Sequence, residues 1–213
     1  MTLALTLADF LPVWGFLAAN IVTPGPNVLT TIALSMGSGR QAGMGSALGV
    51  GLGIAGWCLG MTLGMSALVR VLPGVERALT LAAVALLCWF AFRYFRAAWA
   101  GFRARAMRLP PKSEGLGFAA GFRRALLVNA LNPKALTSWL AILGLFPVAR
   151  ATGADIALLC LGACVLSFSI HSAYVLAFSS PAAARAYLRA GWLLQASAGV
   201  LFAAFALRLV AGS

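Results

Sequence analysis

Six long apolar stretches alternate with short polar segments along the chain. They cover about residues 9–35, 42–69, 78–99, 117–147, 153–179 and 186–210. A transmembrane helix needs about 20 mainly apolar residues, so each stretch is long enough to cross a bilayer. The pattern therefore predicts an all-α membrane protein with six transmembrane helices.

The composition excludes an ordinary soluble enzyme. The chain has 213 residues, of which 62% are hydrophobic and only 9% are charged, and its mean hydropathy is +0.95. A soluble domain usually has about 25% charged residues, so this chain could not cover its surface with polar groups. The net charge of +12 would suit a nucleic-acid-binding protein, but the basic residues lie between the apolar stretches. That distribution indicates a lipid bilayer rather than nucleic acid as the partner.

The distribution of the basic residues also predicts the orientation in the membrane. Residues 100–116 form the one long polar segment and carry four basic residues around Pro110 and Pro111, so we predict a cytoplasmic loop there. With this loop inside, eleven Lys and Arg residues lie at cytoplasmic ends and four at outer ends. Positive residues favour the cytoplasmic side, so both termini are predicted outside the cytoplasm. Arg93 and Arg96, near the end of the third stretch, are expected to extend to the inner membrane surface.

The two halves of the chain repeat the same landmarks. Three pairs of landmarks are offset by 108 to 110 residues, about half the chain length. We therefore predict a three-helix unit in residues 1–99 that recurs in residues 117–213. Because three is odd, the second copy crosses the membrane in the opposite sense, which is typical of transporters that alternate access around a central site. The landmarks are residues 20–24 and 129–133, Arg40 and Arg150, and residues 73–77 and 181–185.

Proline-containing motifs interrupt the first and the fourth apolar stretches near mid-membrane. Residues 23–27 read Thr-Pro-Gly-Pro-Asn, and proline breaks a helix because it lacks a donor and clashes with the preceding turn. Thr is a good N-cap and Pro suits the first helical position, so a second half-helix is expected to begin here. The fourth stretch repeats the pattern with Asn132 as the cap, then Pro133 and Lys134. The alternative is that the prolines only kink two continuous helices.

The two breaks predict a substrate site. Each restarted half-helix would present free N–H groups and the positive end of its dipole, which suit a carboxylate. Asn20, Asn27 and Asn129 could offer oxygens to an ammonium group, although Asn129 could instead bridge two helices. The predicted substrate-binding residues are Asn20, Thr23, Pro24, Gly25, Pro26, Asn27, Asn129, Asn132, Pro133 and Lys134.

Lys134 and His171 are the two titratable side chains inside the predicted spans that are candidates for a transport role. Lys134 is the one Lys or Arg deep within a span, where a charge costs at least about 2.5 kcal/mol. It could bind a substrate carboxylate or couple a proton to transport. Alternatively, it could extend to the membrane surface or cap carbonyls of the opposite half-helix. His171 could relay protons or bind substrate, or it could bond only to the neighbouring backbone.

The sequence lacks the clustered His, Asp, Glu or reactive Cys residues that a membrane enzyme or a redox carrier needs. Cys160 and Cys164 are one turn apart, but no His or carboxylate lies beside them to complete a metal site. We therefore expect no enzymatic activity, no metal and no cofactor. Six glycines spaced by three or four residues, from Gly45 to Gly64, are expected to form one continuous stripe for close helix packing.

Several motifs resemble those of the lysine exporter and homoserine/threonine exporter family (LysE/RhtB). They are the Thr-Pro-Gly-Pro-Asn segment at 23–27, Gly39-Arg40-x-x-Gly43, the segment 89–93, Phe118-x-x-Gly121 and Asn132-Pro133-Lys134. The resemblance covers nearly the whole chain. It implies export of amino acids or close derivatives across the bacterial inner membrane by proton-coupled antiport. The functional core that it implies is Thr23, Pro24, Gly25, Pro26, Asn27, Asn132, Pro133 and Lys134.

One departure from the family pattern bears on the substrate. Many members have an acidic residue in the second stretch, where this chain has Ile54 or a neighbouring apolar residue. A neutral amino acid therefore fits better than a cationic one such as lysine. The alternatives are a passive channel, or export of a non-amino-acid metabolite or a cation. Six helices in a short chain also allow a homodimer.

Overall fold

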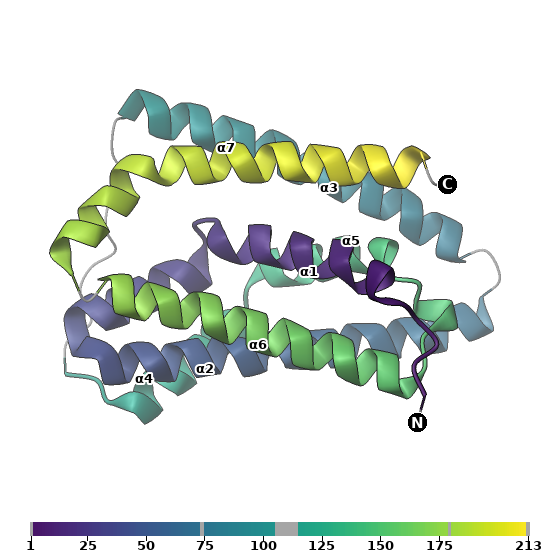
Figure 1. The fold of residues 1–213 in the computed structure, drawn as a ribbon, viewed down its shortest axis with the longest axis horizontal. Helices are drawn as coiled ribbons and strands as arrows, with labels where there is room; N and C mark the ends of the chain where they lie inside the picture. Colours follow the sequence, from purple (N-terminus) through teal and green to yellow (C-terminus); the bar gives the residue numbers. More distant parts are fainter. Residues whose placement is uncertain (1, 73–74, 105–114, 179, 212–213) are drawn as a thin grey trace.

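The computed structural model describes residues 2–72, 75–104, 115–178 and 180–211, and most of them are helical (Figure 1). These ranges contain seven α-helices and one short 3-10 helix, in agreement with the predicted all-α architecture. The elements are α1 (Leu7–Val22), α2 (Pro26–Val71), α3 (Val75–Ala104), α4 (Phe118–Ala130), α5 (Pro133–Leu145), η1 (Val148–Arg150), α6 (Gly153–Phe178) and α7 (Pro181–Ala211).

Four helical segments in the described ranges are long and apolar enough to cross a membrane. They are Pro26–Leu68, Thr80–Ala104, Gly153–Phe178 and Arg189–Ala211. The bent pair α4 and α5 makes a fifth if it is counted as one span. The predicted first span, residues 9–35, does not form a single helix, because it is divided between the 16-residue α1 and the start of α2. The protein is therefore a multi-pass membrane protein, with four or five candidate spans by length and composition among the described residues.

Helix α2 has two arms that meet at Gly39. The short arm covers residues 26–38 and the long arm residues 40–71, and Gly39 is non-helical, with φ 85° and ψ −177°. Glycine adopts a positive φ without the steric penalty that a Cβ brings. One residue thus turns the chain, and Arg40 follows a kink within one long helix instead of lying in a loop.

The helices form three layers in Figure 1. α3 and α7 pack against each other in one outer layer, and α2 packs against α4 and α6 in the other. α1 and α5 lie between these layers, since α5 contacts α3 and α2 while α1 contacts α7 and α6. The C-terminal end of α1 and the N-terminal end of α5 therefore lie in the interior of the molecule.

Figure 1 also shows the direction of each helix. α1 begins and α7 ends at one end of the molecule, whereas α3 ends and α4 begins at the other. α1 and α5 run in opposite senses, as do α3 and α7, and as do α6 and the long arm of α2. Helix α3 continues through Ala104, so the predicted loop 100–116 starts later than expected. Residues 105–114 of that loop lie outside the described part of the chain.

An aromatic cluster joins the α3/α7 layer to α1. The ring centroid of Phe16 in α1 lies 5.0 Å from that of Phe202 in α7 and 6.4 Å from that of Phe90 in α3. All three side chains are buried, and tilted or edge-on contacts at these distances stabilise aromatic pairs beyond their burial. The cluster fixes the α3/α7 layer against the middle of α1.

Only part of the predicted glycine stripe packs against another helix. A Cβ at Gly45 or Gly49 would collide with the main-chain oxygen of Phe118 or Phe122 in α4, so these glycines allow the two backbones to approach closely. A Cβ at Gly60 would meet no atom within 4 Å. The prediction of one continuous packing stripe is therefore wrong for its second half.

Candidate functional site

The first helix break lies between α1 and α2. Val22 is the last helical residue of α1, and α2 begins at Pro26 with Gly25 as its N-cap. A residue before proline is pushed out of the α-helical region, and Thr23 and Gly25 are both extended. The predicted break is thus present, but Thr23 is the C-cap of α1 and not the N-cap of the second half-helix. Two closely spaced prolines delay the restart until Pro26.

The second break separates α4, which ends at Ala130, from α5, which begins at Pro133. The two helices are bent by 60°. Asn132 is the N-cap of α5, and its side-chain oxygen accepts a 3.0 Å hydrogen bond from the main-chain N–H of Lys134. This arrangement agrees with the cap that the sequence predicts.

The side chain of Lys134 links the two breaks. Its Nζ donates hydrogen bonds to the main-chain oxygen of Asn20 at 2.9 Å and to Thr23 Oγ1 at 3.1 Å. It also lies 5.5 Å from the ring centroid of Tyr94. A cation is stabilised at the carbonyl end of a helix. Lys134 therefore caps the end of α1, which is one of the alternatives that the sequence left open.

Thr23 connects three elements through one buried hydroxyl. This hydroxyl donates to the main-chain oxygen of Asn20 at 2.7 Å and lies 2.7 Å from Tyr94 Oη. Because a threonine hydroxyl has a single proton, Thr23 accepts the hydrogen bonds from Lys134 and Tyr94. Helices α1, α3 and α5 thus meet at this group.

Three asparagines form a second link between the breaks. Asn27 Nδ2 donates to Asn129 Oδ1 at 2.8 Å, and Asn132 Nδ2 donates to Asn27 Oδ1 at 3.4 Å. Asn129 is fully buried, and its main-chain oxygen accepts a 3.2 Å bond from Trp57 Nε1. Within the described residues, Asn129 Nδ2 has no hydrogen-bond partner. Asn129 therefore bridges helices and also keeps an unpaired donor.

Asn20 contributes to the same network from the last turn of α1. Its side-chain Nδ2 donates to Ser138 Oγ in α5, and its main-chain oxygen accepts from Lys134 and from Thr23. Ser138 Oγ in turn donates to the main-chain oxygen of Lys134 at 2.5 Å. The end of α1 is therefore bonded to α5 through both its backbone and a side chain.

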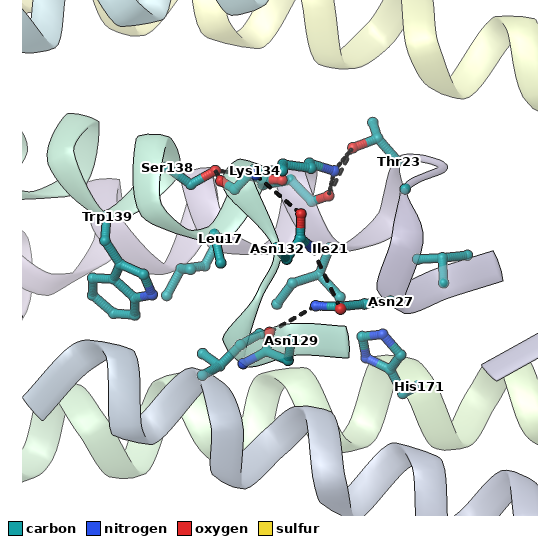
Figure 2. Close-up of a pocket in the computed structure, with 15 residues that line it drawn as sticks. Leu17, Ile21, Thr23, Asn27, Asn129, Asn132, Lys134, Ser138, Trp139 and His171 are labelled. Carbon is teal, nitrogen blue, oxygen red and sulfur yellow. Dashed lines mark hydrogen bonds between the residues drawn. The ribbon is translucent and has the colours of Figure 1, made fainter. Parts of the chain in front are cut away.

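A small cavity of about 50 Å³ lies between the two breaks (Figure 2). Leu17, Ile21 and Trp139 contribute to its apolar wall. A cavity that holds a benzene molecule has about 150 Å³, so this one is too small for an amino acid in this conformation. The predicted site residues that line it are Asn20, Thr23, Gly25, Asn27, Asn129, Asn132, Lys134 and His171.

His171 lines the same cavity from α6 and is only 1% exposed. Its Nδ1 lies 2.9 Å from the main-chain oxygen of Ser167, which requires Nδ1 to carry a proton and to donate it. Nε2 is then an acceptor, and in the described part of the chain it has no partner. Figure 2 shows the ring near Asn27. The backbone contact is present, as one alternative predicts. It involves Nδ1 and leaves Nε2 available for a substrate or a proton.

A second cavity, of about 270 Å³, lies on the other side of the breaks, against α3 and α7. It shares Gly25, Asn132 and Lys134 with the small cavity, and Pro24 and Pro26 line it as well. Pro133 is the remaining predicted site residue, and its side chain lies outside the described part of the chain.

Arg93 in α3 lines this second cavity. Its guanidinium carbon lies 4.7 Å from the ring centroid of Trp89. Arg93 was expected only to extend to the inner membrane surface. The fold brings α3 against the helix breaks, so Arg93 also lines a cavity there.

A comparison with known protein families identifies the chain. A family model described as LysE type translocator matches residues 18–213. The chain belongs to the LysE-type translocator family. The resemblance inferred from the motifs is confirmed. No curated protein and no solved structure matches the chain.

Membership in the LysE-type translocator family defines the broad function. The family consists of transporters and not enzymes, and membership implies export of amino acids or related metabolites. The matched range contains both helix breaks and every residue of the two cavities except Leu17. The two cavities therefore lie within the part of the chain that defines the family.

Sequence reasoning missed several residues that hold the site of this LysE-type translocator together. Tyr174 Oη in α6 donates to the main-chain oxygen of Val22 at 2.7 Å and so caps a second carbonyl of α1. Tyr174 follows His171 by three residues, so a helical spacing could have placed it on the same face. Ser138 follows Lys134 by four residues and could have been placed by the same spacing. Tyr94 gave no such signal, because nothing in the sequence relates it to the first break.

The chemistry of the site is that of binding. Lys134 and the N-terminal ends of α2 and α5 offer positive charge to an anionic group, and His171 offers an acceptor. The described residues contain no group of three or more His, Cys, Asp or Glu that could hold a metal ion.

Proposed function

We propose that this LysE-type translocator is a secondary exporter of neutral amino acids or close derivatives in the bacterial inner membrane. It alternates access around the two helix breaks, and export is coupled to protons by antiport. The observation that carries the proposal is the contact between Lys134 and the end of α1, beside the N-terminal ends of α2 and α5.

The carboxylate of the substrate binds at Lys134. In this structure Lys134 Nζ bonds to two neutral oxygens, those of the Asn20 main chain and the Thr23 hydroxyl. A hydrogen bond between two charged groups is stronger than one to a neutral oxygen, so a carboxylate can displace either of them. Substrate binding then releases the end of α1 from α5.

Acceptors around the small cavity receive the ammonium group and a proton. Asn27 Oδ1 accepts a long hydrogen bond of 3.4 Å from Asn132 and, with two lone pairs, has capacity for a second donor. His171 Nε2 lies on the same cavity and has no hydrogen-bond partner among the described residues. We assign proton coupling to His171, whose ordinary titration range is close to physiological pH. Lys134 is the second candidate for this role.

Inverted repeats supply the motion. Under this proposal, residues 1–99 and 117–213 are two three-helix units. Helix α1 corresponds to α4, the short arm of α2 to α5, the long arm of α2 to α6, and α3 to α7. The long arm of α2 contacts α6, and α3 contacts α7. Each of these two pairs runs in opposite senses in Figure 1, which supports the assignment. The six spans are then completed by α1 with the short arm of α2, and by α4 with α5. Rocking of one unit against the other opens the breaks to either side.

The orientation follows from the basic residues. In the sequence, eleven Lys and Arg residues fall at the ends that are predicted to be cytoplasmic, so the end with the 100–116 connection is assigned to the cytoplasm and both termini to the outside. The cavity of about 50 Å³ between the breaks must widen before a substrate enters. The described conformation is accordingly a closed one.

Uptake into inside-out membrane vesicles tests the function. The vesicles contain the protein and receive a panel of labelled neutral, cationic and anionic amino acids, with and without an acidic interior. We expect saturable uptake of at least one neutral amino acid that increases with the gradient and stops when an uncoupler is added. Flux that never saturates and ignores the gradient would indicate a passive channel, and preferred uptake of lysine would contradict the neutral substrate class.

A further inference from the structure

The cavity of about 270 Å³ is large enough to hold a small metabolite. It exceeds the volume of about 150 Å³ that holds a benzene molecule, whereas the cavity between the breaks is smaller than that. It lies between the α3/α7 layer and the starts of α2 and α5. A substrate therefore fits here in the described conformation, before the breaks open.

The charges around this cavity are positive. Arg93 and Lys134 both line it, and so do residues at the N-terminal starts of α2 and α5. No Asp or Glu is among its lining residues. Asp9 and Asp155 form their contacts away from this cavity. Asp9 pairs with Arg150 at 3.6 Å, and Asp155 accepts a 3.2 Å hydrogen bond from the main-chain N–H of Leu5. An anionic group is therefore favoured in this cavity and an additional cation is disfavoured.

Arg93 differs from its neighbour Arg96 in one respect. Both lie in α3 one turn apart, and each guanidinium stacks over an aromatic ring of the preceding turn, at 4.7 Å from Trp89 and 5.9 Å from Phe92. Arg93 lines the cavity and Arg96 does not. A charged side chain within a span marks a functional site by default, and a guanidinium presents the paired donors that match a carboxylate.

Gln195 in α7 supplies an independent observation. Its side chain is 8% exposed and lines the same cavity. Its Oε1 is buried and, among the described residues, has no hydrogen-bond partner. Buried acceptors normally have a hydrogen-bond donor, so this oxygen is available to a donor from a bound molecule. The ammonium group of an amino acid is such a donor.

We infer that the larger cavity is a binding compartment for zwitterionic amino acids with a bulky apolar side chain, and that Arg93 and Gln195 determine this specificity. The inference rests on the proposed function and extends it to α3 and α7. Arg93 binds the carboxylate together with Lys134, and Gln195 Oε1 accepts from the ammonium group. Trp89 and Phe90, which also line the cavity, contact the apolar side chain.

Binding to the purified full-length protein in lipid nanodiscs tests the inference. The probes are L-leucine, isoamylamine, which lacks the carboxylate, N-acetyl-L-leucine, which lacks the ammonium group, L-threonine and L-lysine. The variants are Arg93→Gln, Arg93→Lys and Gln195→Leu, with Arg96→Gln as the matched control. Size-exclusion chromatography and thermal unfolding establish that each variant is folded.

We expect wild type to bind leucine more tightly than isoamylamine, threonine or lysine. Arg93→Gln should weaken leucine binding about tenfold or more, because one charged hydrogen bond contributes that much. It should leave isoamylamine binding unchanged. Arg93→Lys should recover part of the loss. Gln195→Leu should weaken leucine binding but not N-acetyl-L-leucine binding, because only leucine has the ammonium group.

Other results would overturn the inference in distinguishable ways. If Arg93→Gln and Gln195→Leu bind leucine as tightly as Arg96→Gln does, the larger cavity is not the binding compartment, while the proposed function stands. Binding of threonine in preference to leucine would refute the bulky side-chain class. If wild type neither binds these amino acids nor transports any amino acid in vesicles, the proposed function fails and the inference fails with it.

Discussion

Lys134 and Asn20 are 114 positions apart, yet the Lys134 ammonium donates a 2.9 Å hydrogen bond to the Asn20 main-chain oxygen. Asn20 lies in the last turn of α1, and Lys134 lies in the first turn of α5. The cation is therefore placed at the negative end of one helix by the start of another. Through this bond, the two helix breaks behave as one structural unit.

Replacing Lys134 by alanine removes this bond and the cation that we assign to the substrate carboxylate. We expect export to fall about tenfold or more, and stability to fall by about 1–3 kcal/mol because buried oxygens lose their donor. Uptake into inside-out vesicles and thermal unfolding in detergent measure the two effects. Arg123→Ala is the control, because Arg123 is exposed and its Nε bonds within α4, to the Ala119 oxygen. Normal export by a folded Lys134→Ala protein would refute the assignment.

Replacing Asn132 by aspartate separates the capping role from the binding role. A carboxylate oxygen still accepts from the Lys134 main-chain N–H, so Asn132→Asp should keep the helix start, whereas Asn132→Ala should cost about 1 kcal/mol. The negative charge should nevertheless repel a substrate carboxylate and reduce export about tenfold. Thermal unfolding and vesicle uptake of both variants check this. If Asn132→Asp exports as well as wild type, the substrate carboxylate binds elsewhere.

The positions of the breaks could be predicted because their causes are local. Proline removes a donor and restricts the residue before it, and Asn132 caps the helix that follows it, whatever the rest of the fold does. The N-cap of the second half-helix was predicted at Thr23, whereas it is Gly25. The prediction considered Thr23 as a cap before Pro24 and neglected Pro26, which restricts Gly25 and moves the helix start to residue 26. The family could be inferred as well, because the motifs at both breaks occur together.

The partners of these residues could not be predicted, because they depend on packing between distant helices. Lys134 had two possible partners in the sequence, and only the fold shows it at the end of α1. Gln195 is one polar residue in an apolar stretch, with no neighbouring signal. Arg93 resembled Arg96 in every local respect, and only the position of α3 beside the breaks distinguishes them.

Replacing His171 by glutamine should uncouple transport from the proton gradient. Gln keeps a hydrogen-bonding side chain of similar length but does not titrate, so exchange of labelled for unlabelled substrate should continue while gradient-driven uptake falls about tenfold or more. Both modes are measured in the same inside-out vesicles. Ser172→Ala, at the next position and outside both cavities, is the control. Gradient-driven uptake that survives in His171→Gln would transfer the coupling role to Lys134.

Two glycines of the same stripe in α2 should respond to alanine in opposite ways. A Cβ at Gly45 collides with the Phe118 main-chain oxygen, whereas a Cβ at Gly60 meets no atom within 4 Å. Gly45→Ala should therefore push α4 away and destabilise the protein by about 1–3 kcal/mol. Gly60→Ala should be neutral or stabilise it by up to about 1 kcal/mol, because alanine is the better helix former. Thermal unfolding of the two variants in the same detergent compares them directly. Equal loss in both would mean that the Gly60 face is packed in the membrane, as it would be against a second copy of the chain.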